Sequence, residues 1–200
     1  MKTPEIVFMK TTFILSCLLV GGSFMLKETN KAERPSTSLY KTSTSKRAIA
    51  AAPIGAISIV IDKSDYELHV YDSKGWYATY PVVFGNPSLA DKKMEGDKLT
   101  PEGSFRIQNK RVHEKWVRYL GLDYPTRESL EKFNMRKRRG EIPANARPGA
   151  GIGIHGVFEH DDFMIDRYKN WTNGCIALKN RDVQEIYSFA PVGTSVTIRK

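Results

Sequence analysis

The sequence predicts a mostly β domain with two short helices, in which the residues suited to chemistry lie on loops late in the chain. In the first half, apolar and polar residues alternate along successive runs, as expected for strands that bury one face. Turn-forming residues at 62–65 and 72–75 separate these runs and indicate an antiparallel meander. The alternation predicts strands at residues 57–61, 68–70, 76–84, 104–107 and 196–198.

Helical patterns occur at two places in the second half of the chain. Thr126 is suited to cap a first helix, and Gly140 is suited to end it. Asn180 is suited to cap a second helix, which stops before Pro191. Between the two helices, residues 143–153 are rich in glycine and proline and predict an irregular segment.

The N-terminal part differs in composition from the rest of the chain. Residues 1–26 begin with a basic stretch, and the apolar run 13–26 has the length of an export-signal core rather than of a membrane span. Residues 27–52 are polar and predict a linker, and the folded domain is expected at 53–200. We therefore expect a protein exported to the periplasm or cell envelope. Cleavage, lipidation at Cys17 and retention as a membrane anchor remain alternatives.

The chain is basic, with 31 Lys and Arg against 22 Asp and Glu and a net charge of +9. A positive protein suits polyanionic partners such as nucleic acid, anionic lipid or an acidic envelope polymer. The one dense basic cluster, residues 136–139, falls where the first helix ends and is interpreted as a solvated helix end. No nucleic-acid-binding motif accompanies it, so a nucleic-acid partner is not expected.

Cys175 is the only cysteine outside the N-terminal apolar run. An exported protein with a single cysteine cannot form an internal disulfide, so the thiol needs another explanation. A histidine within hydrogen-bond reach can lower the pKa of a thiol, and His155 is the candidate partner. Backbone N–H groups around Asn173 and Gly174 are suited to an oxyanion hole. The residues alone equally fit a buried, inert cysteine and a structural histidine.

A metal site is the rival use of the same region. The possible ligands are His155, His160, Asp161, Asp162 and Cys175. Zinc sites usually contain tight pairs such as Cys-x-x-Cys, whereas here only two histidines are close, on an expected loop. We therefore expect neither a metal nor another cofactor, and the two aspartates are interpreted as solvated loop charges.

His155 and Cys175 belong to a series of separated motifs. The first motif is His155-Gly156. Sixteen residues separate His155 from the second motif, TNGCI at 172–176. Other parts of the series are IVIDK at 59–63, LHVY at 68–71, GDKLTPEGSF at 96–105, NWT at 170–172 and IALKN at 176–180. The series resembles the catalytic domain of L,D-transpeptidases (the YkuD-type domain), in which a histidine precedes a Ser/Thr-His-Gly-Cys motif. The resemblance covers the whole expected domain.

The resemblance implies a fold, a reaction and residue roles. The fold is a β-sandwich or set of mixed sheets with the catalytic loop late in the chain. Cys175 matches the nucleophile, acylated by a peptidoglycan stem peptide with loss of its terminal D-alanine. His155 matches the general base, and the Gly156 carbonyl matches the group that orients it. The implied oxyanion and substrate residues are Trp171, Thr172, Asn173 and Gly174. Peptidoglycan stem peptides are the implied partners, and a monomer is expected.

Two positions depart from the family pattern. Asn173 stands where a histidine is common, and Ala177 stands where Arg or Asn is common. Loss of a long side chain at position 177 is expected to open the site or weaken substrate positioning. Two alternatives therefore stay beside transpeptidation. One is a thiol hydrolase of the same fold, acting as an L,D-carboxypeptidase or as an amidase that releases a wall-linked protein. The other is a non-catalytic peptidoglycan-binding module.

Overall fold

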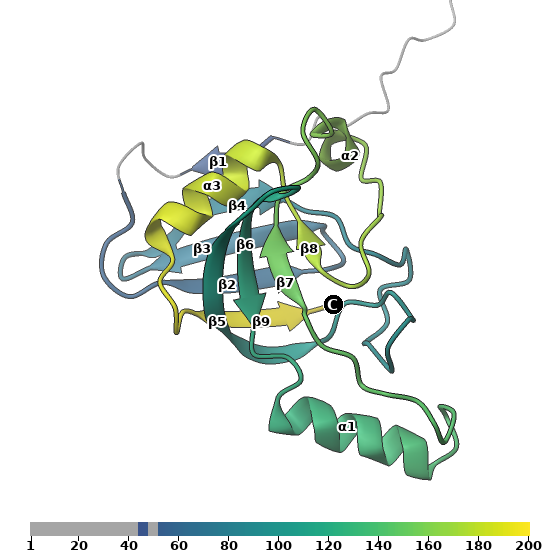
Figure 1. Cartoon of the computed structure of the whole chain (residues 1–200). Coiled ribbons are helices and arrows are strands. Elements are labelled where there is room, and N and C mark those ends of the chain that lie inside the picture. Colours follow the sequence, from purple (N-terminus) through teal and green to yellow (C-terminus); the bar gives the residue numbers. More distant parts are fainter. Residues whose placement is uncertain (1–43, 48–51) are drawn as a thin grey trace, which may run out of the picture. The chain divides into compact units, whose positions relative to one another are not determined.

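The computed structural model describes residues 44–47 and 52–200, so the expected export segment and most of the expected linker lie outside the described residues. Within these ranges the chain forms nine strands and three helices (Figure 1). The strands are β1 (Lys46–Arg47), β2 (Ser58–Asp62), β3 (Glu67–Asp72), β4 (Gly75–Pro81), β5 (Gly103–His113), β6 (Val117–Leu122), β7 (Gly153–His155), β8 (Ile176–Ala177) and β9 (Ser195–Arg199). The helices are α1 (Arg127–Arg138), α2 (Phe163–Asp166) and α3 (Asn180–Phe189).

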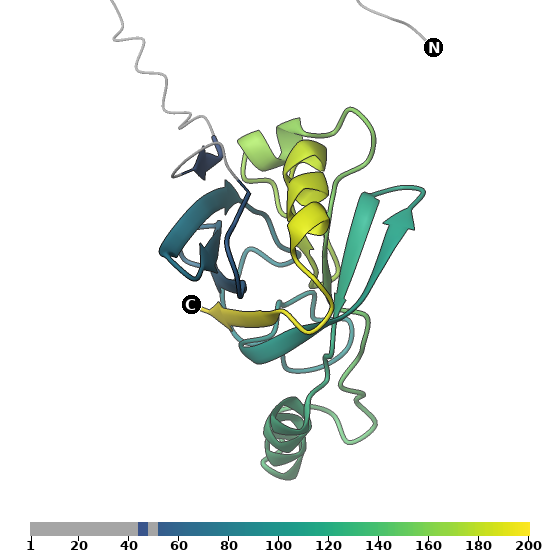
Figure 2. The same cartoon turned by 90° about the vertical axis from the view of Figure 1, so that its left-hand side faces the viewer.

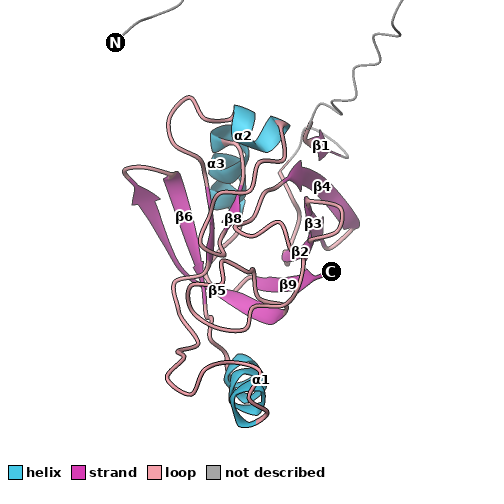
Figure 3. Ribbon diagram, turned by 90° about the vertical axis from the view of Figure 1, so that its right-hand side faces the viewer, coloured by secondary structure: helices cyan, strands magenta, loops and turns pink. Residues whose placement is uncertain are grey.

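The strands join in one curled, mixed sheet with the order β1-β4-β3-β2-β9-β5-β6-β7-β8. β2, β3 and β4 form the predicted antiparallel meander, and β9 lies parallel to β2. The long strand β5 connects the two parts of the sheet (Figure 3): residues 103–106 pair with β9, whereas residues 107–113 pair with β6. The prediction of a mostly β fold with mixed sheets is confirmed.

The apolar residues of the alternating pattern form the core beneath the sheet. Ile59 and Ile61 of β2 are buried, and so are Leu68 and Val70 of β3. The register sets Ile59 opposite Val70 and Ile61 opposite Leu68, so these side chains form one apolar face. α3 adds its own buried residues to the same cluster, and Figure 2 shows it between the meander and the β5–β6 hairpin.

The two predicted helices form, but only one is capped as expected. The Thr126 hydroxyl accepts a hydrogen bond at 3.2 Å from an N–H in the first turn of α1. α3 begins at Asn180, and its N-cap is Lys179. The side chain of Asn180 accepts the Val157 N–H at 3.0 Å instead. The N–H of Asn180 donates to Asp162 at 2.9 Å, so Asp162 is a helix-end partner from another loop rather than a solvated charge.

Several short elements have no signal in the sequence pattern. β7 and β8 are three and two residues long, too short for alternation to be detected. β1 lies in the segment expected to be a linker, where it pairs with β4. α2 is a third helix of four residues, and α1 lies at the opposite end of the domain from α2 and α3 (Figures 1 and 3). Every helix in the described part of the chain falls short of the length and apolar character needed to cross a membrane.

Candidate active site

The two candidate catalytic residues lie on neighbouring parallel strands. β7 pairs with β8, with His155 opposite Ala177. Cys175 directly precedes β8, and continuing the register sets it opposite Gly153, two residues before His155. Side chains two apart on a strand share a face, and paired residues of neighbouring strands point the same way. The thiol and the imidazole therefore emerge on one face of the sheet as diagonal neighbours.

His155 is buried and held in one tautomer. Its Nδ1 lies 2.6 Å from the backbone oxygen of Gly156. A carbonyl oxygen can only accept, so Nδ1 carries the proton and Nε2 keeps a lone pair. Burial lowers the pKa of His155 to about 4, while the bond to Gly156 acts in the opposite direction and the charge of His113 adds to the lowering. The imidazole is neutral at pH 7, as a general base must be.

Three aromatic rings surround the imidazole. Trp116 stacks on it with ring centroids 4.3 Å apart and planes 22° apart. Trp171 meets it edge-on at 5.6 Å, and Tyr119 of β6 lies nearly parallel to it at 6.3 Å. These rings replace water around the base and so account for the desolvation that depresses its pKa. Trp171, expected in the substrate site, is therefore a neighbour of the base.

The thiol of Cys175 contacts the segment that enters β7. Sγ lies 3.4 Å from the carbonyl oxygen of Gly151, to which it donates, and it accepts the Gly153 N–H. The Tyr119 hydroxyl donates to the same Gly151 oxygen at 2.9 Å. Burial raises the pKa of the thiol above its ordinary value, although the Gly153 N–H and the charge of Lys92 act in the opposite direction.

The resting pair therefore consists of a neutral thiol and a neutral imidazole. The expectation that His155 lowers the pKa of Cys175 is wrong, because burial disfavours the charged form of both groups. A neutral imidazole has no charge with which to stabilise a thiolate. For Cys175 to act as a nucleophile, a base such as Nε2 of His155 would have to take the thiol proton.

Thr172 fixes the turn that leads to the cysteine. It is buried, and its hydroxyl donates to the Cys175 carbonyl at 2.8 Å while accepting the Gly174 N–H at 3.2 Å. Gly174 has a φ of +118°, and a Cβ there would lie 2.7 Å from the Leu99 carbonyl oxygen, so the turn requires glycine. Since the Gly174 N–H is engaged, the N–H groups of Asn173 and Cys175 are the donors that the turn leaves for an oxyanion.

Hydrogen bonds attach this turn to the segment that follows β4. The N–H groups of Trp171 and Thr172 both donate to the carbonyl of Phe84, at 2.8 and 3.2 Å. The Asn170 side chain accepts the Phe84 N–H at 2.7 Å. A Cβ on the next residue, Gly85, would lie 2.3 Å from the Thr172 carbonyl oxygen. The Asn-Trp-Thr motif is therefore an anchor that positions the cysteine turn.

A cleft of about 320 Å³ opens beside Asn173. One side is formed by Lys92, Glu95 and Lys98, and another by Gly149, Ala150 and Ile152. Gly151, whose carbonyl contacts Cys175 Sγ, lies between Ala150 and Ile152 in the chain. The cleft thus lies next to the segment that holds the thiol, and of the expected substrate residues Asn173 lines it.

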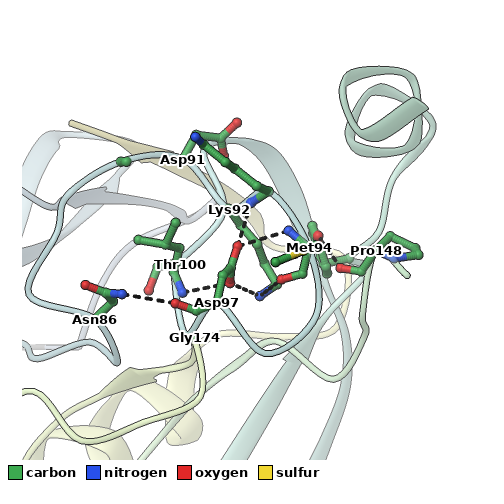
Figure 4. A network of polar contacts seen from close by, with 12 residues as sticks. Asn86, Asp91, Lys92, Met94, Asp97, Thr100, Pro148 and Gly174 are labelled. Atoms are coloured by element: carbon green, nitrogen blue, oxygen red, sulfur yellow. Dashed lines mark hydrogen bonds and ion pairs between the residues drawn. The ribbon is translucent and has the colours of Figure 1, made fainter. Parts of the chain in front are cut away.

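A charged network holds the loop at residues 85–102, which forms one side of the cleft (Figure 4). Asp97 accepts the Lys92 ammonium at 2.7 Å and three N–H groups of its own loop at 2.7 to 3.0 Å. The two side chains are only 3% and 11% exposed. Burial acts to raise the pKa of Asp97, but the ion pair and the N–H donors lower it overall. Asp97 of the GDKLT segment therefore shapes the cleft.

Position 177 does not face the cleft. Ala177 is fully buried and belongs to a small apolar cluster with Val83, Val157 and Ile165. The alanine at this position is therefore part of the core. Within the described residues, no three His, Cys, Asp or Glu side chains come close enough to hold a metal ion. His160 is exposed on its loop.

Sequence reasoning missed some neighbours of the pair. Tyr119 had no signal, because β6 shows no clear alternation. Asn180 was recognisable only as a polar residue at a helix start, yet it crowds Gly156: a Cβ on Gly156 would lie 2.2 Å from the Asn180 Oδ1 and 2.7 Å from the Trp116 carbonyl oxygen. The glycine of the His-Gly motif is therefore required by close packing around the base.

Solved structures of other proteins are similar to this chain. Pgp2 from Campylobacter jejuni, described as a helical cell shape determining protein, is similar with 21% identity and a TM-score of 0.53, over 80% of this chain and 51% of Pgp2. This chain thus spans about half the length of Pgp2. An L,D-transpeptidase from Xylanimonas cellulosilytica is similar with 17% identity and a TM-score of 0.47, over 74% of this chain and 63% of that one. A comparison with curated protein sequences found no match.

The family follows from the sequence itself. Residues 56–198 match the model of the L,D-transpeptidase catalytic domain, YkuD. This match covers most of the chain and contains β2 to β8, both residues of the Cys–His pair and the loop that borders the cleft. The curled mixed sheet agrees with it. The chain therefore belongs to the L,D-transpeptidase catalytic domain family.

Proposed function

We propose that the protein is a cysteine-dependent L,D-transpeptidase that cross-links or remodels peptidoglycan stem peptides in the cell envelope. The observation that carries the proposal is the 2.6 Å contact between His155 Nδ1 and the Gly156 carbonyl, which leaves Nε2 free to accept a proton beside Cys175. Family membership supports the same chemistry. The N-terminal apolar run supports export, with the domain free or held at the membrane by that run.

In the acylation step, a tetrapeptide stem lies in the cleft with the carbonyl between its third residue and D-alanine next to Cys175. Sγ attacks the carbonyl carbon as Nε2 of His155 takes the thiol proton. The Gly156 carbonyl stabilises the resulting imidazolium through Nδ1–H, and the Cys175 N–H stabilises the oxyanion. Nε2 then gives its proton to the amine of D-alanine, which leaves, and a thioester remains on Sγ.

In the second step, an amine of another stem attacks the thioester carbon and gives its proton to Nε2 of His155. The thiol leaves, regains that proton, and a new peptide bond joins the two stems. Attack by water at the same carbon would release a tripeptide stem, which is the hydrolase alternative. A non-catalytic binding module would need neither Cys175 nor His155.

Incubation with purified disaccharide-tetrapeptide, followed by mass spectrometry, tests the proposal. We expect a cross-linked dimer and free D-alanine from the parent, and neither product from Cys175→Ala or His155→Ala. His69→Ala is the matched control, because His69 lies on β3 and contacts Thr79 rather than the site. A tripeptide without dimer, even at high acceptor concentration, would favour the hydrolase. No product from the parent would favour the binding module.

A further inference from the structure

Trp116 makes two separate contacts with the unit that carries the base. Its ring stacks on the His155 imidazole at 4.3 Å. Its backbone oxygen accepts the Gly156 N–H at 3.1 Å, and the Gly156 carbonyl in turn holds His155 Nδ1. Trp116 comes from the turn between β5 and β6, far from the cysteine motif in sequence. One distant residue therefore contacts both the ring and the peptide unit that orients it.

Trp116 interacts through its aromatic ring rather than through its indole N–H. Its indole N–H is buried and has no acceptor among the described residues. A buried donor without a partner costs about 1–3 kcal/mol, so hydrogen bonding does not explain a tryptophan here. The indole also stacks on His113, at 4.3 Å with planes 11° apart. The indole therefore stacks on two imidazoles, and one of them is that of His155.

The backbone beside Trp116 is in an uncommon conformation. Val117 has a φ of +60°, a region that β-branched residues rarely adopt. Such a conformation costs on the order of 1–3 kcal/mol and persists only where the surrounding structure holds it. The Trp116 carbonyl, just before it, accepts from Gly156 and from the Arg118 N–H. The strained turn thus coincides with the contact that anchors Gly156.

We propose that Trp116 is the positioning residue of the general base: its ring fixes the imidazole plane and excludes water, and its carbonyl holds Gly156, so that Nε2 of His155 faces Cys175. The proposal rests on the function proposed above, and it adds a residue that belongs to neither the His-Gly nor the Gly-Cys motif. Trp116 contacts His155 and Gly156, so it acts through His155.

The titration of His155 tests this role directly. The charge of His113 acts on the ring, Tyr119 lies nearly parallel to it, Arg111 lies over the Tyr119 ring, and Cys175 is on the neighbouring strand. The substitutions tested leave all of them in the chain. In the full-length chain with isotope-labelled histidine, NMR should give a His155 pKa of about 4. In Trp116→Ala it should rise toward the ordinary value of 6.5, because water reaches the ring.

Turnover of disaccharide-tetrapeptide provides the second readout. In Trp116→Ala we expect kcat to fall by about a hundredfold with little change in KM, because the base loses its geometry while the cleft remains. Trp116→Phe keeps an aromatic face and lacks only the unused N–H, so it should keep both a low His155 pKa and most of kcat. Trp76→Ala is the matched control, since Trp76 is half exposed on β4 and bonds Thr79.

Parent-like titration and kcat in folded Trp116→Ala would overturn the proposal, as would an equal loss in Trp76→Ala. If Trp116→Ala does not fold, Trp116→Leu and Trp116→Phe decide. A retained kcat in Trp116→Leu would show that any apolar side chain suffices and would overturn the positioning role. A kcat that falls in Trp116→Leu but is kept in Trp116→Phe would support it. A parent without transpeptidase activity would refute the proposed function, yet a raised His155 pKa in Trp116→Ala would still support this inference.

Discussion

The Nδ1 atom of His155 lies 2.6 Å from the carbonyl oxygen of Gly156, the next residue in the chain. A carboxylate at this place would carry a charge and raise the pKa of the imidazole, whereas a carbonyl has only a partial charge. Burial therefore dominates, and the pKa of His155 falls to about 4. The same burial raises the pKa of Cys175. Both groups of the Cys–His pair are thus neutral in the resting protein.

The first prediction is that activity has an acid limb at low pH. kcat/KM should rise through a pH of about 4 and level off well below neutrality, because His155 must be unprotonated to accept the thiol proton. The rate of Cys175 alkylation by iodoacetamide should have its pH midpoint above that of an ordinary thiol. An acid limb near pH 6.5 with a thiol midpoint below the ordinary value would indicate a thiolate–imidazolium pair and contradict this prediction.

The second prediction links His155 to stability. Its pKa is about 4 in the folded protein and 6.5 when unperturbed, so between these values the unfolded chain binds a proton that the folded chain does not. Stability is therefore lost as pH falls from 6.5 to 4, by about 3 kcal/mol from this group. Urea unfolding at pH 7 and pH 4.5 measures it. Between these two pH values, His155→Gln should lose less stability than the parent, because it lacks the titrating group. His69→Gln should lose as much as the parent. Equal losses in all three proteins would refute the link between His155 and stability.

The third prediction concerns the turn before the nucleophile. Thr172→Val removes a hydroxyl that bonds both the Cys175 carbonyl and the Gly174 N–H, so kcat should fall about tenfold or more. Thr194→Val is a matched control, since the buried Thr194 also donates to a carbonyl three residues away, that of Pro191 at 2.8 Å. Both should lose about 1–2 kcal/mol of stability. Equal kcat in the two variants would show that the turn needs no such anchor.

The meander could be predicted because alternation is a property of each strand alone. Ile59 and Ile61 point to one face whatever lies beside them. β7 and β8 have too few residues for such a signal, and they are strands only because β6 and β7 pair with them. Asn180 shows the same limit: its side chain fits a helix cap, but the Val157 N–H uses it and Asp162 serves the helix start.

The candidate residues could be singled out because a lone cysteine and a His-Gly pair are uncommon, and because they match the family motifs. Cys175 and His155 carried that signal in the sequence. Their protonation states could not be inferred, because burial by Trp116 and Tyr119 sets them. Those rings arrive from the β5–β6 hairpin, and contacts between distant segments leave no local pattern. The direction in which the pKa of the thiol shifts could therefore not be predicted from the sequence.

The fourth prediction addresses the loop beside the cleft. Lys92→Met leaves the nearly buried Asp97 carboxylate without its cation, which should cost about 3–5 kcal/mol and disturb KM. Arg127→Met is the control, because its ion pair with Glu131 on α1 is exposed and should be worth about 0.5 kcal/mol or less. Urea unfolding and substrate titration measure the two effects. Similar stability of the two variants would mean that the buried pair contributes no more than a surface one.

The last prediction concerns the start of the folded unit. Lys46–Arg47 forms β1 against β4, and the Ser45 hydroxyl donates to the buried carboxylate of Asp182 at 2.7 Å. A chain that begins at residue 53 lacks both contacts.

Such a chain should be about 1–2 kcal/mol less stable than one that begins at residue 44, the first described residue before β1. Its activity should be unchanged, since the Cys–His pair and the cleft are built from residues after 84. Ser45→Ala in the longer chain separates the Asp182 bond from the strand pairing, and should account for part of the loss. Urea unfolding measures all three chains. Equal stability would show that β1 contributes nothing to the fold, whereas lost activity in the shorter chain would mean that α3, through Asp182, depends on this segment to support the base.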